Sequence, residues 1–102
     1  MVRGVAWLIL TRAFDGAAYL RLLLVAEGEQ SRGVGAALLS RAERRAREAR
    51  SRHLALLVTG TNRRARNFYE REGYRLVGIL PGYVRPGIDE ALYVKDCGSS
   101  RK

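Results

Sequence analysis

The sequence has few of the residues on which several classes of protein depend. Its single cysteine, Cys97, cannot form a disulfide framework or a thiolate metal site within the chain. With His53 as the only histidine, no metal site is predicted. No run approaches the roughly 18 apolar residues that a membrane-spanning helix needs. We therefore expect a cytoplasmic protein that has no membrane partner.

Lysine is also scarce, whereas arginine is abundant. Two lysines stand against 17 arginines, and the formal net charge is +9 at pH 7. A positive protein attracts polyanions, which include nucleic acids and cofactors that carry several phosphates. The aromatic residues fall at apolar-periodic positions and do not alternate with basic residues, as they would in a stacking platform for nucleic acid. The charge therefore favours solvated helix faces and a phosphate-bearing cofactor over nucleic acid.

At 102 residues the chain is long enough for one domain with one modest core, which we expect at residues 1–97. The Gly/Ser-containing segment 98–102 is expected to be a flexible tail. Apolar runs predict strands at 5–10, 19–25, 53–58, 74–80 and 91–94. Helical spacing predicts helices at 34–50 and 63–72. The predicted fold class is therefore α/β (α+β), with a central mixed sheet of about five strands and two helices.

The sequence also predicts how the second helix ends and which face of the first helix is buried. Gly73 follows the second helix at a position suited to a left-handed cap. The buried stripe of the first helix is predicted to consist of Val34, Leu38, Ala42, Ala46 and Ala49.

A glycine-containing turn, Gln30-Ser31-Arg32-Gly33-Val34-Gly35, joins the second predicted strand to the first predicted helix. A helix N-terminus leaves N–H donors unpaired and carries a positive partial charge, so it stabilises an anion. Glycines let those donors converge and let a phosphate approach closely. Taken alone, such a turn has a second explanation, because many glycine turns serve only to start a helix. No Gly-Lys-Ser/Thr follows, and Leu38 stands where a dinucleotide fingerprint needs its third glycine.

A second motif, Asn62-x-x-Ala65-x-x-Phe68-Tyr69-Glu70-x-x-Gly73-Tyr74, lies in the second predicted helix. Together with the glycine turn, in this order and at this separation, it resembles the GNAT family of acyl-CoA-dependent N-acetyltransferases. The resemblance extends over about residues 4–96 and implies acetyl-CoA as the cofactor.

The resemblance also implies roles for individual residues. The strand before the turn splays from its neighbour, so the backbone of Leu24 and Val25 lines a slot for the pantetheine arm, and the Val25 N–H polarises the thioester carbonyl. Asn62 contacts that arm or orients the site. Tyr69 protonates the leaving thiolate, although its spacing alone also fits a core aromatic beside Phe68. The pyrophosphate is held by Gln30, Ser31, Arg32, Gly33, Val34, Gly35 and Ala36.

The acceptor side is less defined. The segment from Gly82 to Ala91 resembles a hairpin of protein Nα-acetyltransferases, so Tyr83 is predicted to contact the substrate. Glu27, Glu29 and His53 are better explained as solvated or structural residues than as a general base. The base therefore stays unassigned.

Family members carry a strand, two helices and another strand before the element expected at residues 5–10, and those helices form one wall of the acceptor site. The leading function is acetyl transfer from acetyl-CoA to a primary amine, at a protein N-terminus or on a small molecule, by direct attack in a ternary complex. A catalytically impaired CoA-binding module is the alternative, and a basic nucleic-acid-binding protein is less favoured. A homodimer through an exposed N-terminal strand is also expected, which light scattering would detect.

Overall fold

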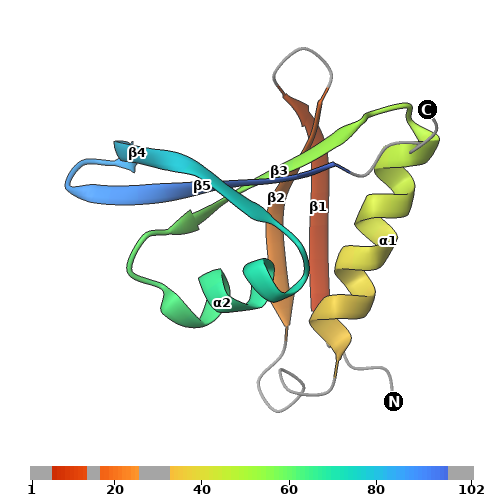
Figure 1. The fold of residues 1–102 in the computed structure, drawn as a ribbon, viewed down its shortest axis with the longest axis horizontal. Helices are drawn as coiled ribbons and strands as arrows, with labels where there is room; N and C mark the ends of the chain where they lie inside the picture. Colours follow the sequence, from red (N-terminus) through yellow and green to blue (C-terminus); the bar gives the residue numbers. More distant parts are fainter. Residues whose placement is uncertain (1–5, 14–16, 26–32, 97–102) are drawn as a thin grey trace.

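The computed structural model describes residues 6–13, 17–25 and 33–96, with side chains for 18–21 and 33–96. The elements are β1 (Ala6–Ala13), β2 (Ala17–Val25), α1 (Val34–Glu48), β3 (His53–Thr59), α2 (Arg63–Arg71), β4 (Arg75–Arg85) and β5 (Ile88–Asp96). The strands form one sheet in the order β1-β2-β3-β5-β4, in which only β2 and β3 pair in parallel (Figure 1). The predicted mixed sheet with two helices is thus confirmed. β1 lies at one edge, and the homodimer through it stays a prediction.

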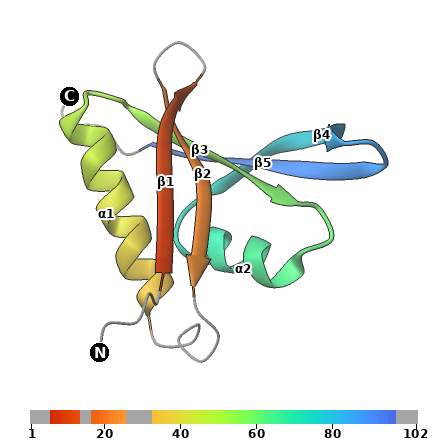
Figure 2. The same ribbon diagram turned by 180° about the vertical axis from the view of Figure 1, so that it is seen from behind.

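Both helices cover the same face of the sheet. On β5, the Tyr93 hydroxyl contacts α2 by donating to Glu70 and accepting from the Arg66 Nε, while the Lys95 Nζ binds Glu43 of α1 at 3.2 Å. Side chains two apart on a strand share a face, so α1 and α2 lie together. Figure 2, seen from behind, shows the strands in front of both helices. Among the described residues, no helix covers that second face.

The core lies between the helices and the sheet. It joins small and large side chains of α1 to the helix-facing residues of β2, β3 and β5, among which Tyr93, Leu54 and Leu56 are almost fully buried. On α1, the buried residues are Gly35, Leu39, Ala42 and Ala46. The prediction was therefore right for the two alanines and wrong for Val34, Leu38 and Ala49. Packing selects the face with three small residues, because these let the helix approach the sheet closely.

The predicted strands were shorter than the observed ones, most of all the last two. β4 continues through Pro81 to Arg85, and β5 begins at Ile88, so the two form a long hairpin. Pro81 is tolerated because β4 is an edge strand, where a missing N–H costs no ladder bond, and because the register shifts between Leu80 and Arg85. The turn signal at Pro81-Gly82 therefore marks an irregularity within the strand, and the chain reverses after Arg85.

Both helices end in the same hydrogen-bonded motif with a left-handed residue. After α2, Gly73 has φ 95°, the Tyr74 N–H donates to the Tyr69 carbonyl, and the Gly73 N–H donates to the Glu70 carbonyl. This confirms the predicted Gly73 cap. After α1, the equivalent position is Arg50, whose φ of 65° strains a residue with a Cβ.

We predict that Arg50→Gly raises the free energy of unfolding by about 0.5–1 kcal/mol, because the relief of left-handed strain exceeds the added freedom of the unfolded chain. Urea denaturation measures the change. Arg52→Gly is the matched control, since Arg52 is also exposed and does not have a positive φ. It should leave stability unchanged or lower it, and an equal gain in both variants would contradict the explanation.

Candidate functional site

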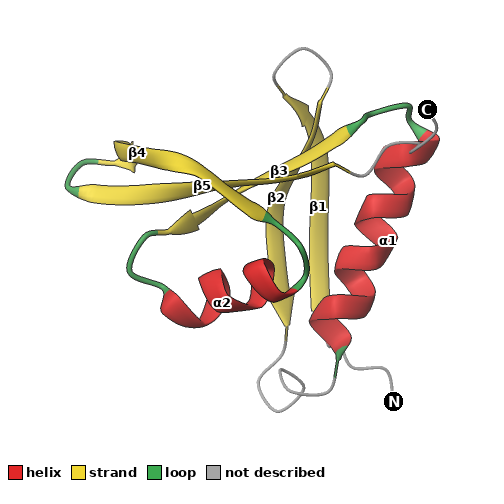
Figure 3. Cartoon of the chain, in the orientation of Figure 1, coloured by secondary structure: helices red, strands yellow, loops and turns green. Residues whose placement is uncertain are grey.

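The parallel strands β2 and β3 pair over a short stretch and then separate. Their register holds Ala18 against Leu54, Tyr19 against Ala55 and Leu20 against Leu56. Beyond that point β2 continues to Val25 and β3 to Thr59 without pairing to each other, and Figure 3 shows the two strands leading to different sides of α2. This is the divergence that the resemblance implies at the end of the strand before the glycine turn.

A β-bulge marks the start of the divergence. On the other side of β2, Leu20 pairs with Leu10 and Leu22 pairs with Ile9, so Arg21 is an extra residue in β2. A bulge bends its strand and increases its local twist. After Arg21, β2 therefore follows β1 and leaves β3.

The far part of β2 has one unpaired edge. Residues 22–25 pair with β1, and alternate N–H and C=O groups of a strand point to its two sides. Groups on the side toward β3 thus have no partner in that strand. Leu24 and Val25 lie in this segment, and their contact with a cofactor stays a prediction.

The N-terminus of α1 lies near the end of β2 (Figure 1). Gly33 is the N-cap residue with φ 78°, no side chain caps the helix, and its first turn contains no acidic residue. The first helical bond runs from the Ala37 N–H to the Gly33 carbonyl, so the N–H groups of Val34, Gly35 and Ala36 are left for another acceptor. Among the described residues, a Cβ on Gly33 would meet nothing within 4 Å.

Part of the predicted phosphate turn cannot be placed. Gln30, Ser31 and Arg32 lie outside the described residues. Their role in holding a pyrophosphate stays a prediction.

Asn62 has a clear local role at the start of α2. Its Oδ1 accepts a hydrogen bond from the Ala65 N–H at 3.1 Å, as an N-cap residue does. The preceding turn is tied to β5, because the Gly60 N–H donates to the Asp89 carbonyl at 2.8 Å. Capping alone explains an asparagine here, and its contact with the cofactor is a separate prediction.

Tyr69 of α2 is 8 % exposed and packs edge-on against Phe68 and Tyr74, with ring centroids 5.0 and 5.7 Å away. Burial raises the pKa of Tyr69 to about 12. The ring therefore belongs to the core, as its spacing allowed. Among the described residues, the Tyr69 hydroxyl forms no hydrogen bond. Every fully buried polar side-chain atom in that part of the chain has a partner, so the Tyr69 hydroxyl is not fully buried and reaches solvent.

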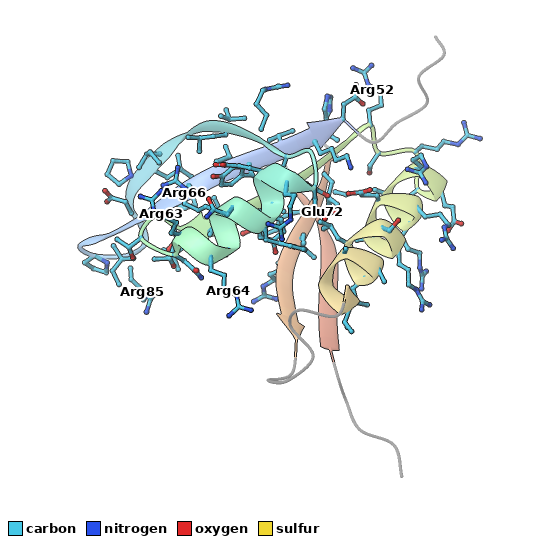
Figure 4. The ribbon with its side chains drawn as sticks, turned by 60° about the horizontal axis from the view of Figure 1, so that its bottom comes forward. Arg52, Arg63, Arg64, Arg66, Glu72 and Arg85 are labelled. Atoms are coloured by element: carbon cyan, nitrogen blue, oxygen red, sulfur yellow. The ribbon has the colours of Figure 1, made fainter. Side chains whose placement is uncertain are left out.

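Arginines concentrate around the start of α2. Figure 4 shows Arg63, Arg64 and Arg66 along this helix and Arg85 on the neighbouring hairpin. The Arg66 guanidinium is held by the Tyr93 hydroxyl and the Gly60 carbonyl, each at 3.0 Å, whereas Arg63 and Arg64 are exposed. A shallow pocket of about 470 Å³ lies beside Arg66, and none of the predicted cofactor residues lines it.

Tyr83 is 63 % exposed on β4, whereas Tyr69 belongs to the core. Burial raises the pKa of Tyr19, and the negative charges of Glu90 and then of ionised Tyr83 add to this effect. Tyr19 faces away from the helices, because its neighbours Ala18 and Leu20 belong to the core on the helix side.

Tyr19 and Glu90 did not stand out in the sequence. The register of β2, β3 and β5 places them on the same face of the sheet, and the alternation within each strand was the only signal for it in the sequence. His53, in contrast, is exposed at the start of β3, and Glu27 and Glu29 lie outside the described residues.

Comparison with known proteins assigns the family. The model of the Acetyltransferase (GNAT) family matches residues 3–74, and the chain belongs to this family. It is 40% identical over 78 residues to the blasticidin-S acetyltransferase of Streptomyces morookaense, which covers 76% of this chain and 56% of that protein.

Solved structures agree on the fold. A nourseothricin acetyltransferase superposes with a TM-score of 0.84 and 26% identity over 91% of this chain and 58% of that one. A GNAT family acetyltransferase from Elizabethkingia anophelis with acetyl-CoA bound has a TM-score of 0.82 and 16% identity, over 90% and 68% of the two chains. The chain thus spans little more than half the length of the curated relative and of the nourseothricin enzyme.

The described residues contain neither a membrane-spanning helix nor a cluster of metal ligands. None of their helices is both long and apolar enough to cross a membrane. None of their histidine, cysteine and acidic residues form a group of three or more that could hold a metal ion.

The raised pKa of Tyr69 predicts a loss of stability at high pH. The unfolded tyrosine ionises near its ordinary value of 10 and the folded one near 12, so the folded state binds more protons in this window. Stability is full below pH 10 and falls by about 2–3 kcal/mol as the pH rises to about 12. Urea denaturation across this range should show a smaller fall for Tyr69→Phe, and parallel curves would contradict the assigned pKa.

Proposed function

We propose that the protein binds acetyl-CoA and transfers the acetyl group to a primary amine within a ternary complex. The observation that carries this proposal is the divergence of β2 from β3 next to an uncapped helix N-terminus. When bound, acetyl-CoA supplies an acetyl group activated as a thioester.

Phosphate binding is assigned to the start of α1. The N–H groups of Val34, Gly35 and Ala36 have no intrahelical acceptor, and the helix dipole favours a negative charge there. Gln30, Ser31 and Arg32 extend this set by sequence. The absence of an acidic residue from the first turn leaves the positive end of the dipole uncompensated.

The unpaired edge of β2 is suited to hold an extended arm that carries amide groups. Pairing with β1 fixes the backbone of Leu24 and Val25, so the N–H and C=O groups of this segment that point away from β1 are oriented before a ligand arrives. We assign to the Val25 N–H the hydrogen bond that polarises the thioester carbonyl. A donor fixed in advance stabilises developing negative charge without reorganisation.

Tyr69 is proposed to serve the leaving sulfur. With a pKa of about 12 its hydroxyl stays protonated at neutral pH, as a donor must. Full transfer of its proton to a thiolate with an ordinary pKa of about 8.5 would be uphill by about 5 kcal/mol. The hydroxyl therefore acts as a hydrogen-bond donor that stabilises the negative charge on the sulfur as the carbon–sulfur bond breaks, and the thiolate takes up the proton that the attacking amine releases.

Two amine acceptors are proposed for testing. The curated relative is named for blasticidin S, so blasticidin S is the first acceptor to test, and a peptide with a free N-terminus is the second. Asn62 and Tyr83 are proposed to orient the bound molecules. A cytoplasmic location and a homodimer through β1 remain part of the proposal.

We predict that Gly33→Ala weakens acetyl-CoA binding about tenfold or more, because its Cβ would occupy the open approach to the helix N-terminus. Thermal shift and calorimetric titration with acetyl-CoA measure this, with ATP as the comparison ligand. Gly87→Ala is the matched control, because Gly87 also has a positive φ (79°) and open space around it. Both variants should lose similar stability, but only Gly33→Ala should lose affinity, and normal affinity in that variant would reject the phosphate site.

We predict that Tyr69→Phe lowers kcat by about 10²-fold or more and leaves the affinity for acetyl-CoA nearly unchanged, because only the donor to the sulfur is removed. Release of free thiol from acetyl-CoA reports turnover. Tyr74→Phe removes a core hydroxyl that donates to Glu43 and should keep wild-type turnover. If Tyr69→Phe loses cofactor affinity instead, Tyr69 is structural.

The same assays separate the alternative functions. Acetyl-CoA binding without thiol release for any amine would favour a CoA-binding module. Salt-sensitive binding of duplex DNA that acetyl-CoA does not affect would favour a nucleic-acid-binding protein.

A further inference from the structure

Among the described residues, all the large apolar side chains that are exposed belong to one strand. They lie on β4 and are 40–63 % exposed: Leu76, Val77, Ile79, Tyr83 and Val84. β4 is the last strand of the sheet, so no further described strand covers its outer side. Exposed apolar side chains that gather in one place mark a surface that contacts another molecule.

The hairpin of β4 and β5 also extends past the strand that supports it. β3 pairs with β5 only from Glu90 to Asp96, so residues 81–89 form a ribbon without a third strand among the described residues. Figure 1 shows this end of the hairpin projecting beyond β3 and α2. A ribbon of two strands is marginally stable in water unless another surface packs against it. The hairpin is therefore suited to a partner.

Part of the exposed apolar surface faces α2. Leu76 pairs with Tyr93 and Ile79 pairs with Ala91, and directly opposed residues of an antiparallel pair share a face. Tyr93 and Ala91 belong to the core on the helix side, so Leu76 and Ile79 face that side as well. They are nevertheless 40 % and 44 % exposed. The apolar strip on the helix side thus continues past the part of the hairpin that α2 covers.

The shallow pocket beside Arg66 lies between this strip and α2. Ile79 and Ile88 line it from the hairpin, and Arg66 lines it from the helix. Its volume of about 470 Å³ is in the range of pockets that hold a ligand. Asp89 is also in its lining, and the Asp89 Oδ1 already accepts a hydrogen bond from the Gly82 N–H at 3.2 Å. We call this place, with its rim, the α2–hairpin groove.

Arginines that form no ion pair with a described acid surround the groove. The Arg66 guanidinium is fixed by the Tyr93 hydroxyl and the Gly60 carbonyl through Nε and Nη1, so among the described residues its Nη2 has no acceptor. Arg63 begins α2 and Arg85 ends β4, and both are exposed (Figure 4). The charge of Arg63 opposes the helix dipole, so the fold gains nothing from it there.

Charge complementarity identifies the occupant of the groove. A second copy of this chain would bring the same arginines and a further formal charge of +9, so two copies repel each other at this surface. A nucleic acid offers phosphates but no apolar side chains to cover Leu76 and Ile79. A polypeptide segment that carries both acidic and apolar side chains satisfies both parts of the surface.

The edge of β4 limits how such a segment can bind. Val77 is an extra residue in β4, because Leu76 pairs with Tyr93 and Gly78 pairs with Leu92, and Pro81 has no N–H to donate. Addition of a long strand along the outer edge is therefore blocked. Contacts of side chains in the groove have to supply the binding.

We propose that the α2–hairpin groove docks an acidic segment of a partner protein. Apolar side chains of the segment cover Ile79 and Ile88, and its carboxylates bind Arg63, Arg66 and Arg85. The docking surface goes beyond the proposed acetyl transfer, because none of the predicted cofactor residues lines the pocket. The segment serves to hold a partner and is not the acceptor of the acetyl group.

The first test uses a short peptide in which aspartate or glutamate alternates with leucine. Its ends are acetylated and amidated, so it cannot act as an amine acceptor. The chain has three isoleucines, so methyl-labelled isoleucine spectra report Ile79 and Ile88 in the groove and Ile9 of β1 as an internal control. The peptide should shift the signals of Ile79 and Ile88 and leave that of Ile9 in place.

Two comparison peptides test the chemistry of the segment. One has serine in place of leucine, and the other has lysine in place of the acidic residues. Neither should shift the isoleucine signals. Shifts with either of them that equal those of the acidic leucine peptide, or no shifts with the latter, would overturn the proposal.

Variants separate the groove from general attraction between opposite charges. Arg63→Glu/Arg85→Glu should weaken peptide binding at least about tenfold, whereas Arg41→Glu/Arg44→Glu, on the exposed side of α1, should change it less than about twofold. Ile79→Ser should also weaken binding, and its melting temperature should stay near that of the wild type because Ile79 is exposed. Equal losses in the two arginine variants, or an unchanged affinity in Ile79→Ser, would overturn the proposal.

The same spectra test the other occupants. Acetyl-CoA should not displace the peptide, and displacement would place the peptide in the cofactor site and overturn the proposal. A short DNA duplex should not shift Ile79 and Ile88, and shifts larger than those of the peptide would assign the groove to nucleic acid. If light scattering finds a dimer that Ile79→Ser converts to a monomer, the occupant is a second copy, which would also overturn the proposal.

Discussion

The bulge at Arg21 is the constraint on which the rest of the site depends. One extra residue in β2 ends its pairing with β3 after Leu20 and keeps its pairing with β1. A parallel pair stabilised along its whole length would leave no unpaired backbone between the strands. The short ladder sacrifices several hydrogen bonds, and the resulting edge of β2 is the feature that suits an extended, amide-bearing ligand. The core on the helix side compensates for this loss by joining β2, β3 and α2 in one cluster.

The two faces of the sheet differ in how their polar groups are satisfied. On the helix side, polar side chains are paired: Tyr93 lies between Arg66 and Glu70, and Glu43 binds both Tyr74 and Lys95. These contacts hold both helices to β5. On the opposite side, Glu90 has no such partner among the described residues. The first arrangement serves the fold.

Much of the fold could be predicted because it is local. Apolar periodicity located all seven elements, and Gly73 was placed as a cap because left-handed backbone at a helix end favours glycine. The errors arose where packing or edge position overrides the local signal. Leu39 is buried on α1 and Leu38 is only half-buried, because the three small residues choose the helix face, and Pro81 continues β4 because an edge strand tolerates it. Arg50 adopts the left-handed cap without being glycine, which no local rule foretold.

The sequence by itself determined the family resemblance, the glycine turn and the candidate acid Tyr69, because these are short motifs whose chemistry depends on residues near each other in the chain. Only the tertiary structure decided that Tyr69 is buried deeply enough to raise its pKa to about 12. It also decided which acid faces the separated strands. Glu90 and Tyr19 share one face of the sheet because of the register of three strands, to which residues 71 positions apart give no local clue.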